Sequence, residues 1–215
     1  MAHKVRAWSY SALEQYELCP RQYAWARIDK LPQPPSFHLE RGIAIHAKAE
    51  QYLLGKIRGV PKELKAFSAE FKNLRKVETV PEQKVALTQQ WELTEWFASD
   101  AWLRIIMDAT VYIEPPLLVD FKTGKIYEKN EHQSRLQAIV HMCIEPEVKK
   151  VNTEMWYLDQ DKIKGWTYHR GTLEDDKQHW IDRVEPLFKE KKWAPTPNNL
   201  CGWCSFKDIC DAAKK

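Results

Sequence analysis

The sequence predicts an α/β domain built around a central mixed β-sheet. Three features lead to this expectation: helical periodicity in the first 76 residues, three strand-like segments between residues 84 and 122, and alternating helix and strand patterns after residue 131. Because helices and strands are interleaved, we expect helices to flank the sheet. A chain of 215 residues is long enough to bury a substantial core.

The helices are expected in five places. The first begins at Ser11, where Ser11-Ala-Leu-Glu14 has the form of a capping box, and runs to about Ile28. Pro32, Pro34 and Pro35 then force a loop. The other helices follow from amphipathic patterns over residues 40–56, 62–76, 131–143 and 173–191.

The strands are recognised by apolar or alternating runs between turn residues. We expect three joined strands at Lys84–Thr88, Leu103–Ile113 and Leu117–Lys122, followed by a pair at Thr153–Asp159 and Lys164–His169. The apolar run that opens the third segment suits a central, buried strand.

Composition limits the class of protein. The chain has 33 basic and 30 acidic residues, and this small excess neither indicates nor excludes a local nucleic-acid groove. Seven glycines argue against a glycine-rich dinucleotide fold. No apolar run is long enough to span a membrane, and residues 1–10 lack the apolar stretch of a signal peptide. We therefore expect a cytoplasmic protein.

The strongest chemical pattern is Asp120-Phe121-Lys122 at the end of the third strand, with Asp108 in the strand before it. Asp120 and Lys122 are two residues apart, so both side chains leave the same face of the strand. Carboxylates from neighbouring strands can hold a divalent ion, with the lysine beside it to neutralise phosphate charge. On these residues alone, a buried salt bridge is the simpler interpretation.

Two helical segments carry polar residues that bear on this site. Gly42 and His46 share one helical face, where a small residue allows close approach to a sheet and the imidazole can reach a metal. A satisfied core or surface histidine is the alternative. Gln133, Gln137 and His141 are spaced four residues apart. Their stripe can hydrogen-bond phosphates or bases, or it can be a solvated helix face.

The cysteines form a second pattern. Cys201, Cys204 and Cys210 make a C-x2-C-x5-C run, and Cys19 lies near the other terminus. Four thiols suit either zinc or an iron–sulfur cluster, and a shared site requires the first helix to pack beside the C-terminal segment. Cys143, in an apolar helix, is expected to be a core thiol. Disulfides are not expected in a reducing compartment.

In combination, these motifs resemble the PD-(D/E)XK nuclease superfamily in its RecB-like branch, and most closely the iron–sulfur exonucleases of CRISPR adaptation and their phage homologues. The resemblance extends over nearly the whole chain. It is carried by residues 9–21, Gly42-x3-His46, Glu82-Gln-Lys84, Arg104 to Asp108, Asp120 to Lys125, Gln137-x3-His141 and the C-x2-C-x5-C tail.

The resemblance implies a restriction-endonuclease-like core in a single domain spanning residues 1–215. It implies a subregion of residues 1–30 and 195–215 in which the four thiols bind a 4Fe-4S cluster and staple the two ends together, with zinc as the alternative occupant. The implied site residues are Asp108, Asp120 and His46 as ligands of Mg2+ or Mn2+, the Phe121 carbonyl as a backbone ligand, Lys122 as the catalytic lysine, Gln137 as the glutamine of a Q-x3-Y motif, Glu82 in a supporting role, and Cys19, Cys201, Cys204 and Cys210 as cluster ligands. His141 stands where the family has tyrosine.

We therefore expect a metal-dependent DNA exonuclease acting on single-stranded DNA in recombination, repair or DNA processing, with endonuclease activity left open. The alternative is a DNA-processing or DNA-holding subunit of a CRISPR adaptation or recombination complex, with protein partners. A metal-stapled structural module without catalysis is a third possibility, which the intact set of Asp108, Asp120 and Lys122 disfavours.

Overall fold

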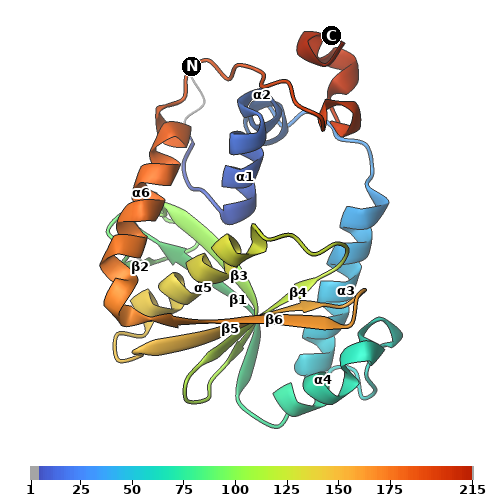
Figure 1. Cartoon of the computed structure of the whole chain (residues 1–215), viewed down its shortest axis with the longest axis vertical. Helices are drawn as coiled ribbons and strands as arrows, with labels where there is room; N and C mark the ends of the chain where they lie inside the picture. Colours follow the sequence, from blue (N-terminus) through green and yellow to red (C-terminus); the bar gives the residue numbers. More distant parts are fainter. Residues whose placement is uncertain (1–4, 215) are drawn as a thin grey trace. The chain divides into compact units, whose positions relative to one another are not determined.

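The computed structural model describes residues 5–214, which divide into two compact units (Figure 1). One unit contains residues 37–177, and the other contains the described parts of residues 1–36 and 178–215. The division falls within the long helix α6 (Leu173–Lys189). None of the helices described is both long and apolar enough to cross a membrane.

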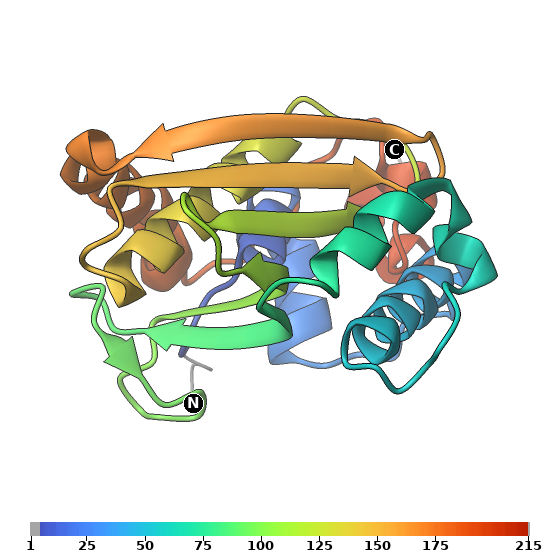
Figure 2. The ribbon, with the colours of Figure 1, turned by 90° about the horizontal axis from the view of Figure 1, so that it is seen from below.

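The unit of residues 37–177 is built on a six-stranded sheet with the strand order β2-β1-β3-β4-β5-β6 (Figure 2). β4 and β5 run parallel, and the other neighbouring strands run antiparallel. The expected α/β class and mixed sheet are therefore confirmed. The strands are β1 (Thr79–Leu87), β2 (Leu93–Thr94), β3 (Leu103–Val111), β4 (Leu117–Lys122), β5 (Lys150–Tyr157) and β6 (Lys162–His169).

Three α-helices accompany this sheet in the same unit: α3 (Phe37–Leu53), α4 (Ser68–Leu74) and α5 (Asn130–Ile144). The segment expected as one helix over 62–76 begins instead as a 3-10 helix, Lys62–Phe67. β2 was not predicted, because two residues are too few to reveal an alternating pattern.

An aromatic core joins α3 and α4 to the centre of the sheet. Phe71 of α4 is fully buried and packs on Phe121 of β4 and Trp156 of β5, with ring centroids 5.1 and 5.3 Å away. Tyr52 of α3 makes an edge-to-face contact with Phe71, with ring centroids 6.3 Å apart. These contacts fix α3 against the strand that carries the acid–lysine pattern.

The N-terminal helix differs from the expectation in two ways. Its N-cap is Ser9, whose Oγ accepts from the Ala12 amide, so the helix α1 (Tyr10–Leu18) does not begin at Ser11. It also does not run to Ile28. Pro20 has no amide hydrogen and restricts the residue before it, so Cys19 is extended and a new short helix follows.

The N-terminal residues pack beside α6 and the residues that follow it. Trp8 stacks on Trp180 of α6 with ring centroids 5.6 Å apart, and Tyr23 stacks on Trp193 at 5.5 Å. Arg183 of α6 also forms a two-pronged ion pair with Glu17. The tail beyond contains short 3-10 turns at Cys201–Trp203, Lys207–Ile209 and Asp211–Lys214.

Replacing Phe71 with alanine should destabilise the protein by about 3–5 kcal/mol, because it empties the centre of the aromatic core. Urea denaturation followed by circular dichroism measures the change. Ile163→Ala is the matched control: Ile163 is 44% exposed on β6, and its loss should change the free energy of unfolding by about 0.5 kcal/mol or less. Equal losses in the two variants would contradict a central packing role for Phe71.

Candidate active site

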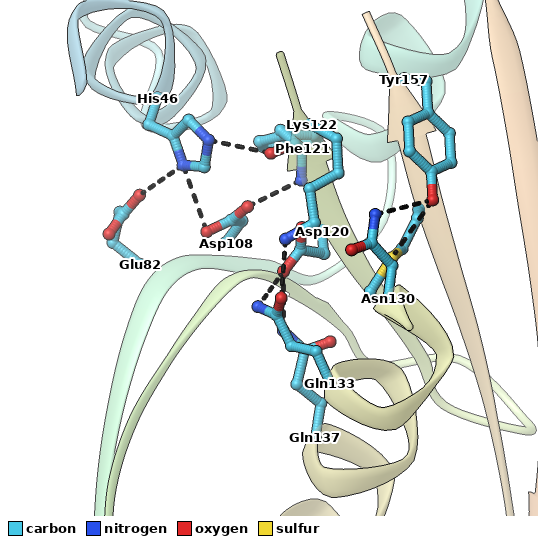
Figure 3. A network of polar contacts seen from close by, with 11 residues as sticks. His46, Glu82, Asp108, Asp120, Phe121, Lys122, Asn130, Gln133, Gln137 and Tyr157 are labelled. Carbon is cyan, nitrogen blue, oxygen red and sulfur yellow. Dashed lines mark hydrogen bonds and ion pairs between the residues drawn. The ribbon is translucent and has the colours of Figure 1, made fainter. Parts of the chain in front are cut away.

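Three side chains from different elements converge at one point of the sheet. His46 of α3, Glu82 of β1 and Asp108 of β3 each offer a ligand atom, and these atoms lie within 4.8 Å of one another (Figure 3). His46 Nδ1 is 3.3 Å from Asp108 Oδ1 and 3.9 Å from Glu82 Oε1. The sequence therefore anticipated both the histidine and the aspartate at this point.

The site lies where two central strands separate. The pairing of β3 with β4 ends at Ala109 and Val119, so the next residues of β4 have no partner on β3. The Asp108 carboxylate occupies the gap, and its Oδ2 accepts from the Phe121 amide at 2.7 Å. An otherwise unsatisfied buried backbone donor thereby fixes the orientation of an acidic side chain.

His46 uses both ring nitrogens. Nε2 donates to the Phe121 carbonyl at 2.9 Å, while Nδ1 faces the carboxylates. Burial alone would lower the pKa of His46, but the hydrogen bond to Asp108 and the charges of Asp108, Asp120 and Glu82 outweigh it and raise the pKa to about 9. A doubly protonated ring fits two acceptors on opposite sides.

Glu82 reaches this cluster through an unusual backbone. It lies opposite Asp108 but is skipped by the pairing of β1 with β3, and its φ of 49° is in the left-handed region. Such a conformation is unfavourable for a residue with a long side chain and is held by its surroundings. Burial, followed by the Asp108 charge, raises the pKa of Glu82. The cluster therefore concentrates negative charge where it is poorly solvated.

Asp120 and Lys122 form the buried ion pair expected as the simpler interpretation, with Lys122 Nζ 2.8 Å from Asp120 Oδ2. Two amides of α5 complete the group: Gln133 and Gln137 donate to Asp120 Oδ1 at 2.8 and 3.0 Å. Burial raises the pKa of Asp120, with Lys122 opposing that change. The Gln133 amide oxygen in turn accepts from Lys122 at 2.7 Å, so each member is held by another.

The polar stripe on α5 is not a solvated face. Gln137 and His141 are 1% and 0% exposed, so that alternative is wrong. Gln133 and Gln137 hydrogen-bond the Asp120 carboxylate. Burial lowers the pKa of His141 to about 4, and it lies beside Tyr112 with ring centroids 6.1 Å apart. A neutral imidazole in this position contributes packing in the core.

The structure brings together seven of the site residues implied by the sequence, but with a different grouping: His46, Glu82, Asp108, Asp120, Phe121, Lys122 and Gln137. Glu82 shares the convergence point with His46 and Asp108, whereas Asp120 faces Lys122 and the α5 amides. The Phe121 carbonyl is hydrogen-bonded to His46. Gln133 was noted only as part of a stripe, and its contact with Lys122 adds it to this group.

A clamp that the sequence did not reveal ties α3 to the loop after β4. Arg41 binds both oxygens of Asp159, and one of these oxygens accepts from the Gly124 amide at 2.9 Å. Gly124 has a φ of 103°, a conformation that suits glycine. A Cβ on Gly42 would lie 3.4 Å from Thr123 Oγ1, so the small residue permits the close approach. The partners are 118 residues apart, and no local pattern connects them.

The four-cysteine cluster expected from the sequence is not formed in the structure. Among the residues described, no three cysteine sulfurs come within 4.8 Å of one another, so the stapling of the two ends by a metal is not observed. Cys19, Cys201, Cys204 and Cys210 are nevertheless among the residues that line one cavity of about 240 Å³. Burial raises the pKa of Cys204, with the three other thiols adding to the effect. Cys143 lies elsewhere, and burial raises its pKa to about 11.

Comparison with known proteins agrees with this architecture. The family model of the PD-(D/E)XK nuclease superfamily matches residues 7–114 and 114–211. The chain therefore belongs to the PD-(D/E)XK nuclease superfamily. The family accounts for the acid–lysine pattern at the end of β4.

Individual relatives are more distant. The Gene 69 protein of Mycobacterium phage D29 is 43% identical over 53 residues, which are 25% of this chain and 20% of that protein. The chain thus matches about a fifth of this relative's length. A crystal structure from Eubacterium rectale, titled as a candidate exonuclease, superposes over 97% of this chain and 87% of its own with a TM-score of 0.53 and 14% identity. The crystal structure of SSO0001 aligns over 98% and 88% with a TM-score of 0.47 and 14% identity.

The residues present fit a divalent cation. Imidazole nitrogen and carboxylate oxygens are ligands that Mn2+ accepts, and carboxylates suit Mg2+. The raised pKa values of Glu82 and Asp120 indicate a site short of positive charge. His46, Asp108 and Glu82 can hold such an ion at the convergence point, with Asp120 close behind them.

Binding of Mn2+ should release a proton from His46, because only the neutral imidazole is a ligand. The pKa of His46 is raised to about 9, so between pH 7 and 9 the apparent affinity should rise about tenfold per pH unit and then level off. Isothermal titration across this range measures the slope. His46→Gln has no proton to release and should flatten the profile. An equal slope in both proteins would contradict this role of His46.

Proposed function

We propose that this chain is a divalent-metal-dependent exonuclease that hydrolyses phosphodiester bonds of single-stranded DNA in recombination, repair or DNA processing. The observation that carries the proposal is the convergence of His46, Glu82 and Asp108 beside the buried pair of Asp120 and Lys122. We further assign the chain to the RecB-like branch of its superfamily, on the sequence motifs that it shares with that branch.

The roles of the residues follow from their contacts. A divalent ion, when bound, would supply an activated water and neutralise charge on the phosphate. His46 and Asp108 would hold it, each oriented by a backbone group of Phe121. Burial lowers the pKa of Lys122, but the Asp120 charge outweighs it and the net pKa is raised. Lys122 therefore presents a full positive charge to a phosphate oxygen at neutral pH.

Asp120 positions that lysine. Its carboxylate receives two amides and one ammonium, so it has little freedom to rotate. Gln133 also binds Lys122 directly, which restricts the ammonium from a second side. Positioned charge of this kind acts without reorganisation during the reaction.

Asp120→Asn should reduce cleavage of DNA by at least about 100-fold, because it removes the charge that holds Lys122. End-labelled single- and double-stranded DNA, incubated with Mn2+ or with chelator, gives the rate and the strand preference. Asp175→Asn, an exposed change of the same kind on α6, is the matched control and should cleave as the wild type does. Wild-type protein that binds DNA without cutting it would contradict the proposal and favour the DNA-holding subunit.

We propose in addition that the four-thiol cavity takes a 4Fe-4S cluster. Four cysteines lining one cavity support this. A cluster placed between the thiolates requires a less close approach of the sulfurs than zinc does, because sulfurs that bind one zinc ion at a bond length of about 2.3 Å would be about 3.8 Å apart. Trp25, which is partly buried, also lines the cavity and can restrict solvent. Such a group would add stability to the termini rather than chemistry to the active site.

Cys204→Ala should therefore remove bound iron and lower the unfolding temperature of anaerobically purified protein by several degrees. Elemental analysis and thermal unfolding measure both effects. Cys143→Ala is the control, because Cys143 is not among the residues that line the cavity, and it should retain the iron. One zinc ion per chain would show that zinc, not a cluster, occupies the cavity. Wild-type protein with neither iron nor zinc would contradict both assignments.

A further inference from the structure

A line of side chains leads away from the convergence point along one side of β1 and β3. Lys84 pairs with Ile106, and Ala86 pairs with Arg104, so these partners project from the same side of the sheet. Lys84 and Ala86 follow Glu82 at every second position of β1, and Ile106 and Arg104 precede Asp108 at every second position of β3. At about 3.4 Å per residue, the line extends about 14 Å from the acidic cluster.

This side of the two strands is open at Lys84 and Ile106, whereas Ala86, farther along, is 2% exposed. Ile106 is 39% exposed, while its neighbours Ile105 and Met107, which point the other way, are 8% and 0% exposed. Lys84 is also exposed, and its charge opposes the rise in the pKa of Glu82, so it lies electrostatically within reach of the cluster. The line is therefore continuous with the candidate active site.

The far end of the line is aromatic and cationic. Lys84 Nζ and Arg104 Cζ each lie 5.9 Å from the ring centroid of Trp96, and Arg104 Cζ lies 5.7 Å from that of Phe97. Phe97 is 85% exposed, which is unusual for a phenylalanine with no packing role. We refer to Lys84, Trp96, Phe97, Arg104 and Ile106 as the aromatic–basic strip.

The cations of the strip are available for a ligand. Neither Lys84 nor Arg104 forms an ion pair with any residue the structure describes. Arg104 Nε is buried and lacks a hydrogen-bond partner among those same residues. Asp100, in the adjoining loop, accepts instead from Thr94 at 2.8 Å.

We propose that the aromatic–basic strip binds the substrate strand beside the active site, with phosphates at Lys84 and Arg104 and an unstacked base on Phe97. This inference rests on the proposed function and names the surface by which the enzyme holds single-stranded DNA. A row of cations with an exposed ring is the combination that binds single strands without reading sequence, because every base has a face to stack. A duplex keeps its bases stacked and cannot use the ring.

The test compares strip variants with variants at the opposite edge of the sheet. Binding of a fluorescent oligothymidylate of about 12 nucleotides, with chelator present, is measured by anisotropy over a range of salt concentrations. The double variant K84Q/R104Q should bind at least about tenfold more weakly, and its salt slope should fall by about 1.4, the value for two phosphates of a single strand. The control K162Q/K164Q removes the same charge from β6 and should bind as the wild type does.

The aromatic arm uses Phe97→Ala, with Ile163→Ala as the exposed control on β6. Phe97→Ala should weaken binding of the single strand by about fivefold or more and leave binding of a blunt duplex unchanged. Thermal unfolding confirms that each variant folds. If both strip variants bind the single strand as tightly as the wild type does, the proposal is overturned. The strip would then stabilise the loop or bind a protein partner. Equal weakening by the β6 controls would overturn it as well.

Failure of the strip can be told apart from failure of the proposed function. Wild-type protein that cleaves labelled DNA with Mn2+, together with strip variants that bind and cleave normally, rejects the strip alone. The opposite result is also informative. If the wild type binds DNA but never cleaves it, and the strip variants bind it more weakly, the nuclease activity is rejected and the strip is retained as a single-strand binding surface.

Discussion

The separation of β3 from β4 is the constraint on which the site depends. Two strands that paired along their whole length would satisfy the Phe121 amide with a backbone carbonyl and leave no room for side chains between them. Because pairing ends at Ala109 and Val119, the amide needs another acceptor, and the Asp108 carboxylate provides it. His46 then binds the Phe121 carbonyl. One peptide segment of β4 therefore sets both an acid and an imidazole in place.

The helices support this gap from two sides. α3 carries His46, and its position is fixed by the aromatic core around Phe71 and by the clamp from Arg41 to Asp159. α5 supplies the amides that hold Asp120, and its buried His141 leaves no charge in the core behind them. A displacement of α3 or α5 would therefore move the candidate ligand atoms directly, because protein interiors packed at crystal-like density transmit small shifts.

The sequence predicted the sheet and most of the site, for reasons that are local. Asp120 and Lys122 stand on one short strand, and His46 and Gln137 stand on regular helices, so spacing alone indicates which side chains share a face. The arrangement between elements was less accessible. That Glu82, rather than Asp120, joins His46 and Asp108 depends on a left-handed backbone that no alternating pattern reveals. The same is true of the clamp, whose partners meet only through tertiary packing.

The site contains more negative charge than its cationic partners offset. Three carboxylates, those of Glu82, Asp108 and Asp120, lie in a partly buried site with two cationic partners, His46 and Lys122. Burial raises the pKa of Glu82 and Asp120, and the neighbouring carboxylates raise the pKa of His46 despite its burial, so the folded chain carries electrostatic strain. Any ligand that supplies positive charge here relieves that strain, and its binding energy adds to the stability of the fold. The left-handed Glu82 and the open gap between the strands are thus unfavourable locally, and together they gather carboxylates at a point where a cation would relieve the strain.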